Sequence, residues 1–193
     1  MKLNSTLVKS TLVAALGGLL FGFDTVVIAG ANEALKLIYQ LTPLLQGITV
    51  AAAIVGTALG AAAAGWPADR LGRRQSLFVL ALLYLATALG CALAWDWNSF
   101  LFFRFISGLA IGGSSVIGPM YIAEIAPAKA RGRLVGMFQF NIVFGVLVAY
   151  LSNYLLGLSG LGGAEWRWKL GVAAVPAAAF FLMLFTIPES PRW

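Results

Sequence analysis

Six long apolar runs constrain the fold of this 193-residue chain more than any other feature. A helix needs about 20 residues, rising about 1.5 Å each, to cross the roughly 30 Å hydrocarbon core of a bilayer. All six runs are long enough, whereas a transmembrane β-barrel would show short segments of alternating polarity. We therefore predict an all-α membrane protein with transmembrane helices at about residues 8–31, 44–65, 75–95, 99–122, 134–157 and 169–187.

The composition excludes most other classes of protein. Hydrophobic residues make up 61% of the chain and charged residues 10%, whereas soluble domains have about 45–50% and about 25%. Such a chain is neither water-soluble nor disordered. One cysteine and no histidine argue against a disulfide framework, a Cys/His zinc site or a histidine-ligated haem, so we expect no metal and no cofactor.

The basic residues are distributed unevenly between the loops. If the N-terminus is cytoplasmic, the outer segments keep only Lys36, Arg167 and Lys169. All other lysines and arginines outside the apolar runs then lie on the inner side, as the positive-inside rule requires. The net charge of +6 is therefore interpreted as a topology signal and not as a nucleic-acid footprint. The same asymmetry predicts that both termini are cytoplasmic. No cleavable signal peptide is evident, so the first span is expected to be retained.

Two charged residues, Asp24 and Arg104, interrupt the apolar runs. A charge at membrane depth costs at least about 2.5–3.5 kcal/mol, which makes each residue a candidate for function. Asp24 lies roughly 9 Å inside the outer end of the first span and Arg104 roughly 8 Å inside the outer start of the fourth. The two side chains are therefore predicted to pair. Two interpretations remain: a structural salt bridge, or a titratable switch in which arginine holds the aspartate ionised until it is protonated.

Further polar and small residues mark the loops and helix contacts. The loop between the second and third spans carries one acid, a glycine turn and three arginines, which suits the binding of helix ends and carboxylates or simply reflects inside charge. Glu124, followed by Arg131 and Arg133, is predicted to form an ionic latch.

Prolines inside the fourth and sixth spans are expected to kink them. Close helix–helix contacts are predicted at the glycine pairs 18/22, 56/60 and 108/112.

Several motifs in the correct order resemble the sugar porter family of the major facilitator superfamily. The loop GWPADRLGRR (65–74) matches the superfamily pattern G-x-x-x-D-R-x-G-R-R, and residues 104–133 match the sugar porter signature around the fourth span. The segments GGLLFGFDTVVIAGA (17–31), WRW (166–168) and PESPRW (188–193) are also typical. The resemblance extends from residue 12 to the end of the chain.

This resemblance implies a cell-membrane transporter of two six-helix halves, each built from inverted three-helix repeats, with substrate bound between the halves. Residues 1–193 would form the N-terminal six-helix half, and the C-terminal half would be its missing partner. The other implied partners are a sugar, a proton and the lipid bilayer. An enzyme is not expected, because the sequence offers no nucleophile–base pair and no metal cluster.

The resemblance also implies roles for individual residues. Asp24 matches the aspartate that takes the coupling proton in symporters of the family, and Arg104 matches its partner. Phe21 and Gln139 match residues that line the sugar site, whereas Val146 replaces a second glutamine of the xylose-symporter pattern. The charge network that joins the halves on the cytoplasmic side matches Asp69, Arg70, Arg73, Arg74, Glu124, Arg131, Glu189 and Arg192.

Proton-coupled sugar symport is therefore the leading hypothesis for function. One alternative is uncoupled, facilitative transport of a sugar or another organic solute. A second alternative, from a different class, is a half-length membrane module that assembles with another half but transports nothing. The sequence does not identify the sugar.

Overall fold

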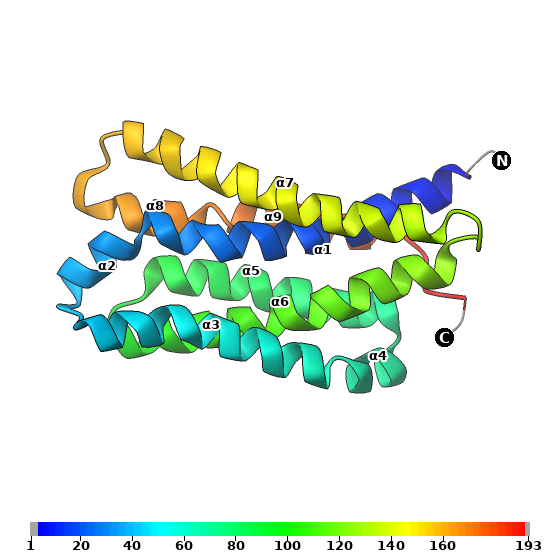
Figure 1. Cartoon of the computed structure of the whole chain (residues 1–193), viewed down its shortest axis with the longest axis horizontal. Coiled ribbons are helices and arrows are strands. Elements are labelled where there is room, and N and C mark those ends of the chain that lie inside the picture. Colours follow the sequence, from blue (N-terminus) through cyan, green and yellow to red (C-terminus); the bar gives the residue numbers. More distant parts are fainter. Residues whose placement is uncertain (1–3, 192–193) are drawn as a thin grey trace.

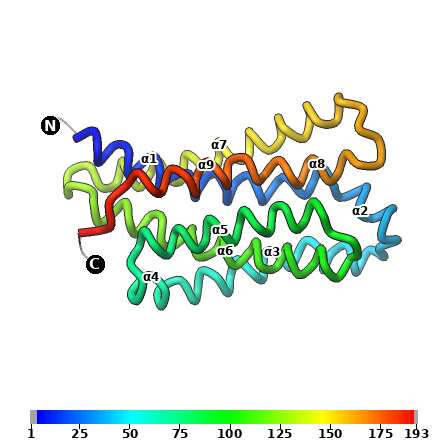
Figure 2. The backbone as a smooth tube through the Cα atoms, turned by 180° about the vertical axis from the view of Figure 1, so that it is seen from behind, coloured from blue at the N-terminus to red at the C-terminus, as the bar shows by residue number. Residues whose placement is uncertain are grey.

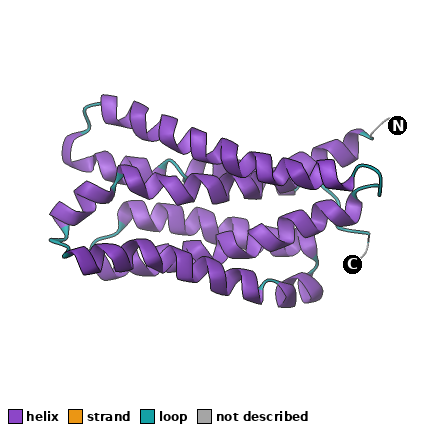
Figure 3. Ribbon diagram, in the orientation of Figure 1, coloured by secondary structure: helices purple, strands orange, loops and turns teal. Residues whose placement is uncertain are grey.

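The computed structural model describes residues 4–191, and all the regular structure in this part of the chain is helical (Figure 3). The elements in chain order are α1 (Ser5–Val27), η1 (Ile28–Gly30), α2 (Asn32–Ile38), α3 (Pro43–Ala63), α4 (Gly65–Leu71), α5 (Arg73–Leu93), α6 (Trp97–Ile125), α7 (Arg131–Leu158), η2 (Gly162–Ala164), α8 (Glu165–Gly171) and α9 (Ala174–Leu184).

Six helical segments of the described chain are long and apolar enough to cross a membrane, which confirms the predicted number. They are Ser5–Gly30, Pro43–Ala63, Arg73–Leu93, Trp97–Ile125, Arg131–Leu158 and Gly162–Leu184. The bounds differ from the apolar runs by a few residues, because polar residues extend helices beyond their hydrophobic part. The fourth helix thus includes Glu124, and the fifth begins at Arg131.

The six long segments run alongside one another, so the described chain traverses the bundle lengthwise six times (Figures 1 and 2). The two chain ends lie at the same end of the bundle as α4 and the connection between α6 and α7 (Figure 1). The opposite end holds α2 and the connection between α7 and α8. Both termini therefore lie on one side of the bundle.

Glycines bring α1 into close contact with α7. A β-carbon at Gly18 would overlap the carbonyl oxygen of Phe138, and one at Gly22 would overlap that of Ile142. In return, Gly145 of α7 faces the carbonyl oxygen of Leu19. The absence of side chains at these positions lets the two backbones touch, as predicted for such pairs in an apolar helix.

Glycines also bring the backbones of α3 and α6 into close contact. Gly56 and Gly60 of α3 lie against backbone atoms of α6, and Gly108 and Gly112 of α6 lie against backbone atoms of α3. Each of the three predicted glycine pairs therefore forms a backbone-to-backbone helix contact. These two close contacts leave little freedom in where the side chains of α1 and α6 are placed.

Proline interrupts the sixth span but not the fourth. Pro176 has no N–H to donate to the carbonyl of Val172, and the helix breaks there into α8 and α9. The Val172 carbonyl instead accepts from the N–H of Val175 at 3.0 Å. Helix α6 continues through Pro119 without interruption.

The segment predicted as a loop between the second and third spans is largely a short helix, α4. It ends at Gly72, whose φ of 87° lies in the left-handed region that glycine adopts without strain. The glycine turn predicted there is therefore confirmed, although the residues before it are helical.

Candidate functional site

The predicted pair of intramembrane charges is formed. Arg104 of α6 donates from Nη1 to Oδ1 of Asp24 on α1, over 2.8 Å. The hydroxyl of Ser107, one turn further along α6, donates to the same oxygen at 3.3 Å. Asp24 is 7% exposed and Arg104 is 4% exposed, so the ion pair lies inside the bundle.

The glycine contacts explain how two charged residues reach the interior. Gly22 precedes Asp24 by two residues and lies against α7, while Gly108 follows Arg104 by one turn and lies against α3. Because both helices are held tightly by their neighbours, their polar residues face each other and not lipid. Desolvating one such ion costs several kcal/mol, so each charge depends on its partner.

A pocket of about 100 Å³ opens beside the pair. Phe21, Asp24 and Arg104 line it together with residues of α3, of which Ala53 and Thr57 are examples. The Thr57 hydroxyl donates to the Ala53 carbonyl, so it is satisfied within its own helix. The pocket therefore has largely apolar walls and one carboxylate–guanidinium pair as its charged feature.

The two residues expected to line a sugar site lie in different surroundings. Phe21 is half-buried and belongs to the pocket beside the pair, whereas Gln139 lies on an exposed face of α7. Its neighbour Phe138 is buried against Gly18 and Gly118. Successive helical residues point about 100° apart, so Gln139 faces away from that contact. The structure therefore brings Phe21, but not Gln139, to the Asp24–Arg104 pair.

A second group of charges lies at the end of the bundle that holds both termini. We call it the terminal charge cluster; it comprises Asp69, Arg73, Arg74, Glu124, Glu189 and Ser190. Arg73 binds Oε1 of Glu124 through Nη2 at 3.0 Å and through Nε at 3.1 Å. Its Nη1 also donates to the Ala68 carbonyl at 2.9 Å and to Asp69 at 3.3 Å.

The other half of the cluster fixes the segment after α9. The backbone N–H of Arg74 donates to Oε1 of Glu189 at 2.9 Å, and its guanidinium donates to the carbonyls of Leu184 and Phe185. The hydroxyl of Ser190 donates to Oε2 of Glu124. These bonds connect the third, fourth and sixth spans.

Three predicted members of the charge network, Arg70, Arg131 and Arg192, are not among the residues of the terminal charge cluster. The latch between Glu124 and Arg131 or Arg133 is wrong: among the described residues Glu124 pairs with Arg73, because α5 packs directly against the last turn of α6. The Nε atom of Arg131 is buried without a hydrogen-bond partner. Arg70 lies over the ring of Trp66, 4.7 Å from its centroid, and Arg192 lies outside the described residues.

Sequence reasoning missed Ser107 and Ser190. Ser107 lies three residues after Arg104, on the same helix face, and that spacing could have identified it. Ser190 reaches Glu124 only because the chain folds back after α9, which no local pattern encodes. Within residues 4–191 no group of three or more Cys, Asp or Glu side chains could hold a metal ion.

A six-helix membrane bundle with a buried carboxylate–guanidinium pair beside a pocket, and a charge cluster at one end, has the organisation of half a secondary transporter. The family described as "Sugar (and other) transporter" matches residues 10–193. The chain therefore belongs to the sugar transporter family of the major facilitator superfamily and corresponds to the N-terminal half of its fold.

Curated relatives agree with this assignment. The chain is 43% identical over 190 residues to a glucose transport protein of Synechocystis, covering 94% of this chain and 41% of that protein. It is 39% identical over 221 residues to the D-xylose-proton symporter of Escherichia coli K12, covering 98% of this chain and 45% of the symporter. The chain thus spans less than half the length of these relatives.

Solved structures match the fold closely. The proton:xylose symporter bound to 6-bromo-6-deoxy-D-glucose superposes with a TM-score of 0.93 at 38% identity, covering 98% of this chain and 46% of that one. A bacterial homologue of the lysosomal transporter Spinster, inward-facing and unoccupied, gives 0.83 at 20% identity, which shows a shared fold alone.

Proposed function

We propose that this chain forms the N-terminal half of a transporter that couples sugar uptake to proton entry. The observation that carries the proposal is the buried Asp24–Arg104 pair beside the pocket that Phe21 lines. A carboxylate at this depth is kept ionised by a guanidinium, and it becomes neutral when it takes up a proton.

The coupling follows from the change of charge. Ionised Asp24 holds Arg104 through a hydrogen bond that joins α1 to α6. Protonation removes the negative charge, weakens this bond and lets α1 and α6 move relative to each other. Release of the proton on the other side restores the bond, so the state of the pair is linked to the direction in which the site opens.

The relatives support sugar as the substrate. Their printed names include a D-xylose-proton symporter, an arabinose-proton symporter and a glucose transport protein. Phe21 offers an aromatic face, and the amide of Gln139 offers both donors and an acceptor for sugar hydroxyls. In the proposed protein these two residues contribute one wall of the sugar site, and a C-terminal six-helix half supplies the other.

The terminal charge cluster is proposed to lie on the cytoplasmic side of the cell membrane, because the basic residues gather at this end. There Asp69, Arg73, Arg74, Glu124 and Glu189 would hold the half against its partner in the outward-facing state. In the same proposal the exposed guanidinium of Arg70 and the half-buried one of Arg131 are available to partners outside this chain, and Arg192 is assigned to the same network by resemblance alone.

Proteoliposome uptake by the full-length gene product tests the coupling. Wild type should accumulate sugar when a pH gradient is imposed, whereas Asp24→Asn should only exchange sugar across the membrane. The matched control is Asp96→Asn, the same chemical change at a half-buried helix cap, which should still accumulate sugar. If wild-type uptake ignores the gradient, or Asp24→Asn still concentrates sugar, the symporter proposal is wrong.

A further inference from the structure

A buried tyrosine beside the ion pair has no hydrogen-bond partner. Tyr84 lies on α5 and is 2% exposed, yet its hydroxyl forms no hydrogen bond within the described chain. Buried hydroxyls almost always have a partner, because leaving one unsatisfied loses the free energy of its hydration. The position of Tyr84 therefore requires an explanation that packing alone does not give.

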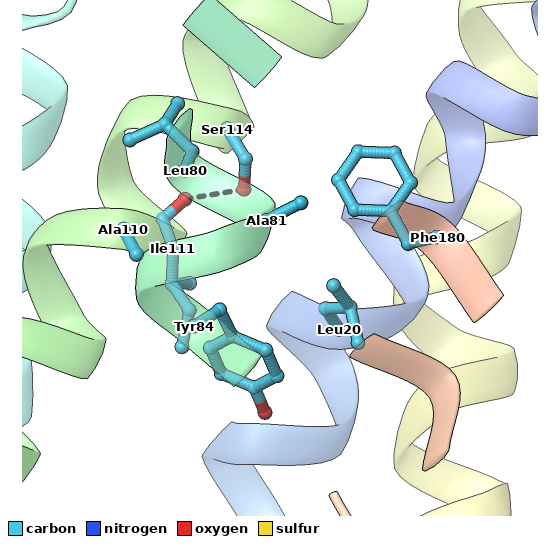
Figure 4. A pocket seen from close by; sticks show the side chains of 8 residues that line it. All are labelled: Leu20, Leu80, Ala81, Tyr84, Ala110, Ile111, Ser114 and Phe180. Carbon is cyan, nitrogen blue, oxygen red and sulfur yellow. Dashed lines mark hydrogen bonds between the residues drawn. The ribbon is translucent and has the colours of Figure 1, made fainter. Parts of the chain in front are cut away.

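One side of the ring offers no partner. Tyr84 forms part of a packed layer between α1, α5, α6 and α9, whose other members include Leu20, Ile111, Ser114 and Phe180 (Figure 4). The gaps between these side chains leave no room for a water molecule. The single hydroxyl among them, that of Ser114, donates to the Ile111 carbonyl. Figure 4 shows the tyrosine hydroxyl directed away from this layer.

The ion pair lies one helical turn from this layer. Leu20 and Ile111, which pack with Tyr84, are four residues from Asp24 and from Ser107 on their helices, and Ile111 also lines the pocket beside the pair. The pair is itself incompletely satisfied: both hydrogen bonds to Asp24 end on Oδ1, and Nε of Arg104 is buried without a partner. Tyr84 thus lies where an ionised carboxylate has an unused oxygen.

Other elements around Asp24 add no titratable group. Helices α3 and α9 contain none, and the tyrosines of α7, Tyr150 and Tyr154, are exposed. Among the described residues, the groups that face Asp24 are therefore Arg104, Ser107 and Tyr84, and the buried thiol of Cys91 follows Tyr84 by two turns of α5. Of these, Cys91 is a weak donor.

We infer that Tyr84 is a positioning residue for the proton site, whose hydroxyl turns to donate to the oxygen of ionised Asp24 that Arg104 and Ser107 leave free. The inference rests on the proposed symport function. The proton that binds Asp24 comes from the aqueous phase, and Tyr84 keeps its own proton throughout. By stabilising the ionised carboxylate, the hydroxyl raises the proton concentration needed to load the site.

Infrared titration of the full-length protein in liposomes tests this inference without requiring transport. The band of the protonated carboxyl is assigned to Asp24 by its loss in Asp24→Asn and is then followed against pH in wild type and Tyr84→Phe. Loss of the donor should allow half-protonation of Asp24 at about tenfold lower proton concentration, which corresponds to one pH unit. Thr87→Val is the matched control, because this buried hydroxyl on the same helix donates to the carbonyls of Leu83 and Tyr84, and it should leave the midpoint unchanged.

An unchanged midpoint in Tyr84→Phe, or an equal shift in Thr87→Val, would overturn the inference. If Tyr84→Phe does not fold, fluorotyrosine at position 84 keeps the ring and makes the hydroxyl a stronger donor, so the midpoint should move to higher proton concentration; no movement refutes the role. Gradient-independent uptake by wild type would overturn the symporter proposal separately, whatever the titration gives.

Discussion

The Asp24–Arg104 pair and the terminal charge cluster use the same chemistry with different redundancy. In the pair, the guanidinium has one hydrogen bond to its carboxylate, and its Nε has none. In the cluster, Arg73 has three partners, Asp69, Glu124 and the Ala68 carbonyl, and Glu124 also accepts from Ser190. A carboxylate with a single ion-pair bond loses that bond when it takes up one proton, whereas an arginine with several partners keeps helices together when one partner is lost.

The largest effect that follows from this comparison is that of Arg104→Leu. The substitution leaves Asp24 buried without a counter-charge, and breaking a buried pair in this way costs about 3–5 kcal/mol. We expect this loss in the free energy of unfolding, measured by denaturant titration in detergent micelles at neutral pH.

The double variant Asp24→Asn with Arg104→Leu separates charge from packing. Because it removes both charges, it should recover more than half of the stability that Arg104→Leu loses. A double variant as unstable as Arg104→Leu would mean that the arginine contributes through its shape and not through its charge.

The tight helix contacts beside the pair predict a second, smaller effect. A β-carbon in Gly22→Ala would overlap the Ile142 carbonyl oxygen and push α1 from α7, at a cost of about 1–3 kcal/mol. Gly136→Ala is the control, because that glycine of α7 has open space around it. Alanine is the better helix former, so the control should be neutral or more stable by up to about 1 kcal/mol in the same unfolding measurement. Equal losses in both variants would argue against backbone contact at Gly22.

The number of helices, the pairing of Asp24 with Arg104 and the glycine contacts could all be predicted from sequence. Each rests on a strong local cost: unsatisfied backbone in lipid, an unpaired charge, or a backbone too close for a side chain. The partner of Glu124 could not be predicted from local sequence, because Arg73 lies 51 residues earlier on the neighbouring helix α5 and competes with the nearer Arg131. Tyr84 could not be singled out either: a lone tyrosine in an apolar run is typical of packing, and only the fold shows that its hydroxyl is buried without a partner in a layer one turn from Asp24.

Removing one member of the terminal charge cluster should have a weaker effect than breaking the pair. In Arg73→Gln, Glu124 keeps the hydroxyl of Ser190, so we expect a loss of about 1 kcal/mol. The two variants are compared by denaturant titration under the same conditions. A loss in Arg73→Gln as large as that in Arg104→Leu would remove the distinction on which the comparison rests.

The smallest expected effect comes from Asp96, a half-buried aspartate between the third and fourth spans. Its carboxylate caps α6 by accepting from the N–H of Ser99 at 2.8 Å. Hydrogen bonding by the side chain and then the backbone of Ser99 lowers the pKa of Asp96 below its ordinary 3.8. Because the pKa of Asp96 is lower in the folded state, the ionised cap contributes its full stability at pH values above the pKa of the unfolded state. This contribution is lost as the pH falls through the pKa of the folded state.

Asn caps a helix about as well but does not titrate. Wild type and Asp96→Asn should therefore differ little at neutral pH, and wild type alone should lose the contribution of its cap as the pH drops below about 4. Urea unfolding of the two proteins across this range measures the difference. A constant difference at all pH values would show that this carboxylate, unlike Asp24, has no energetic role in its charged form.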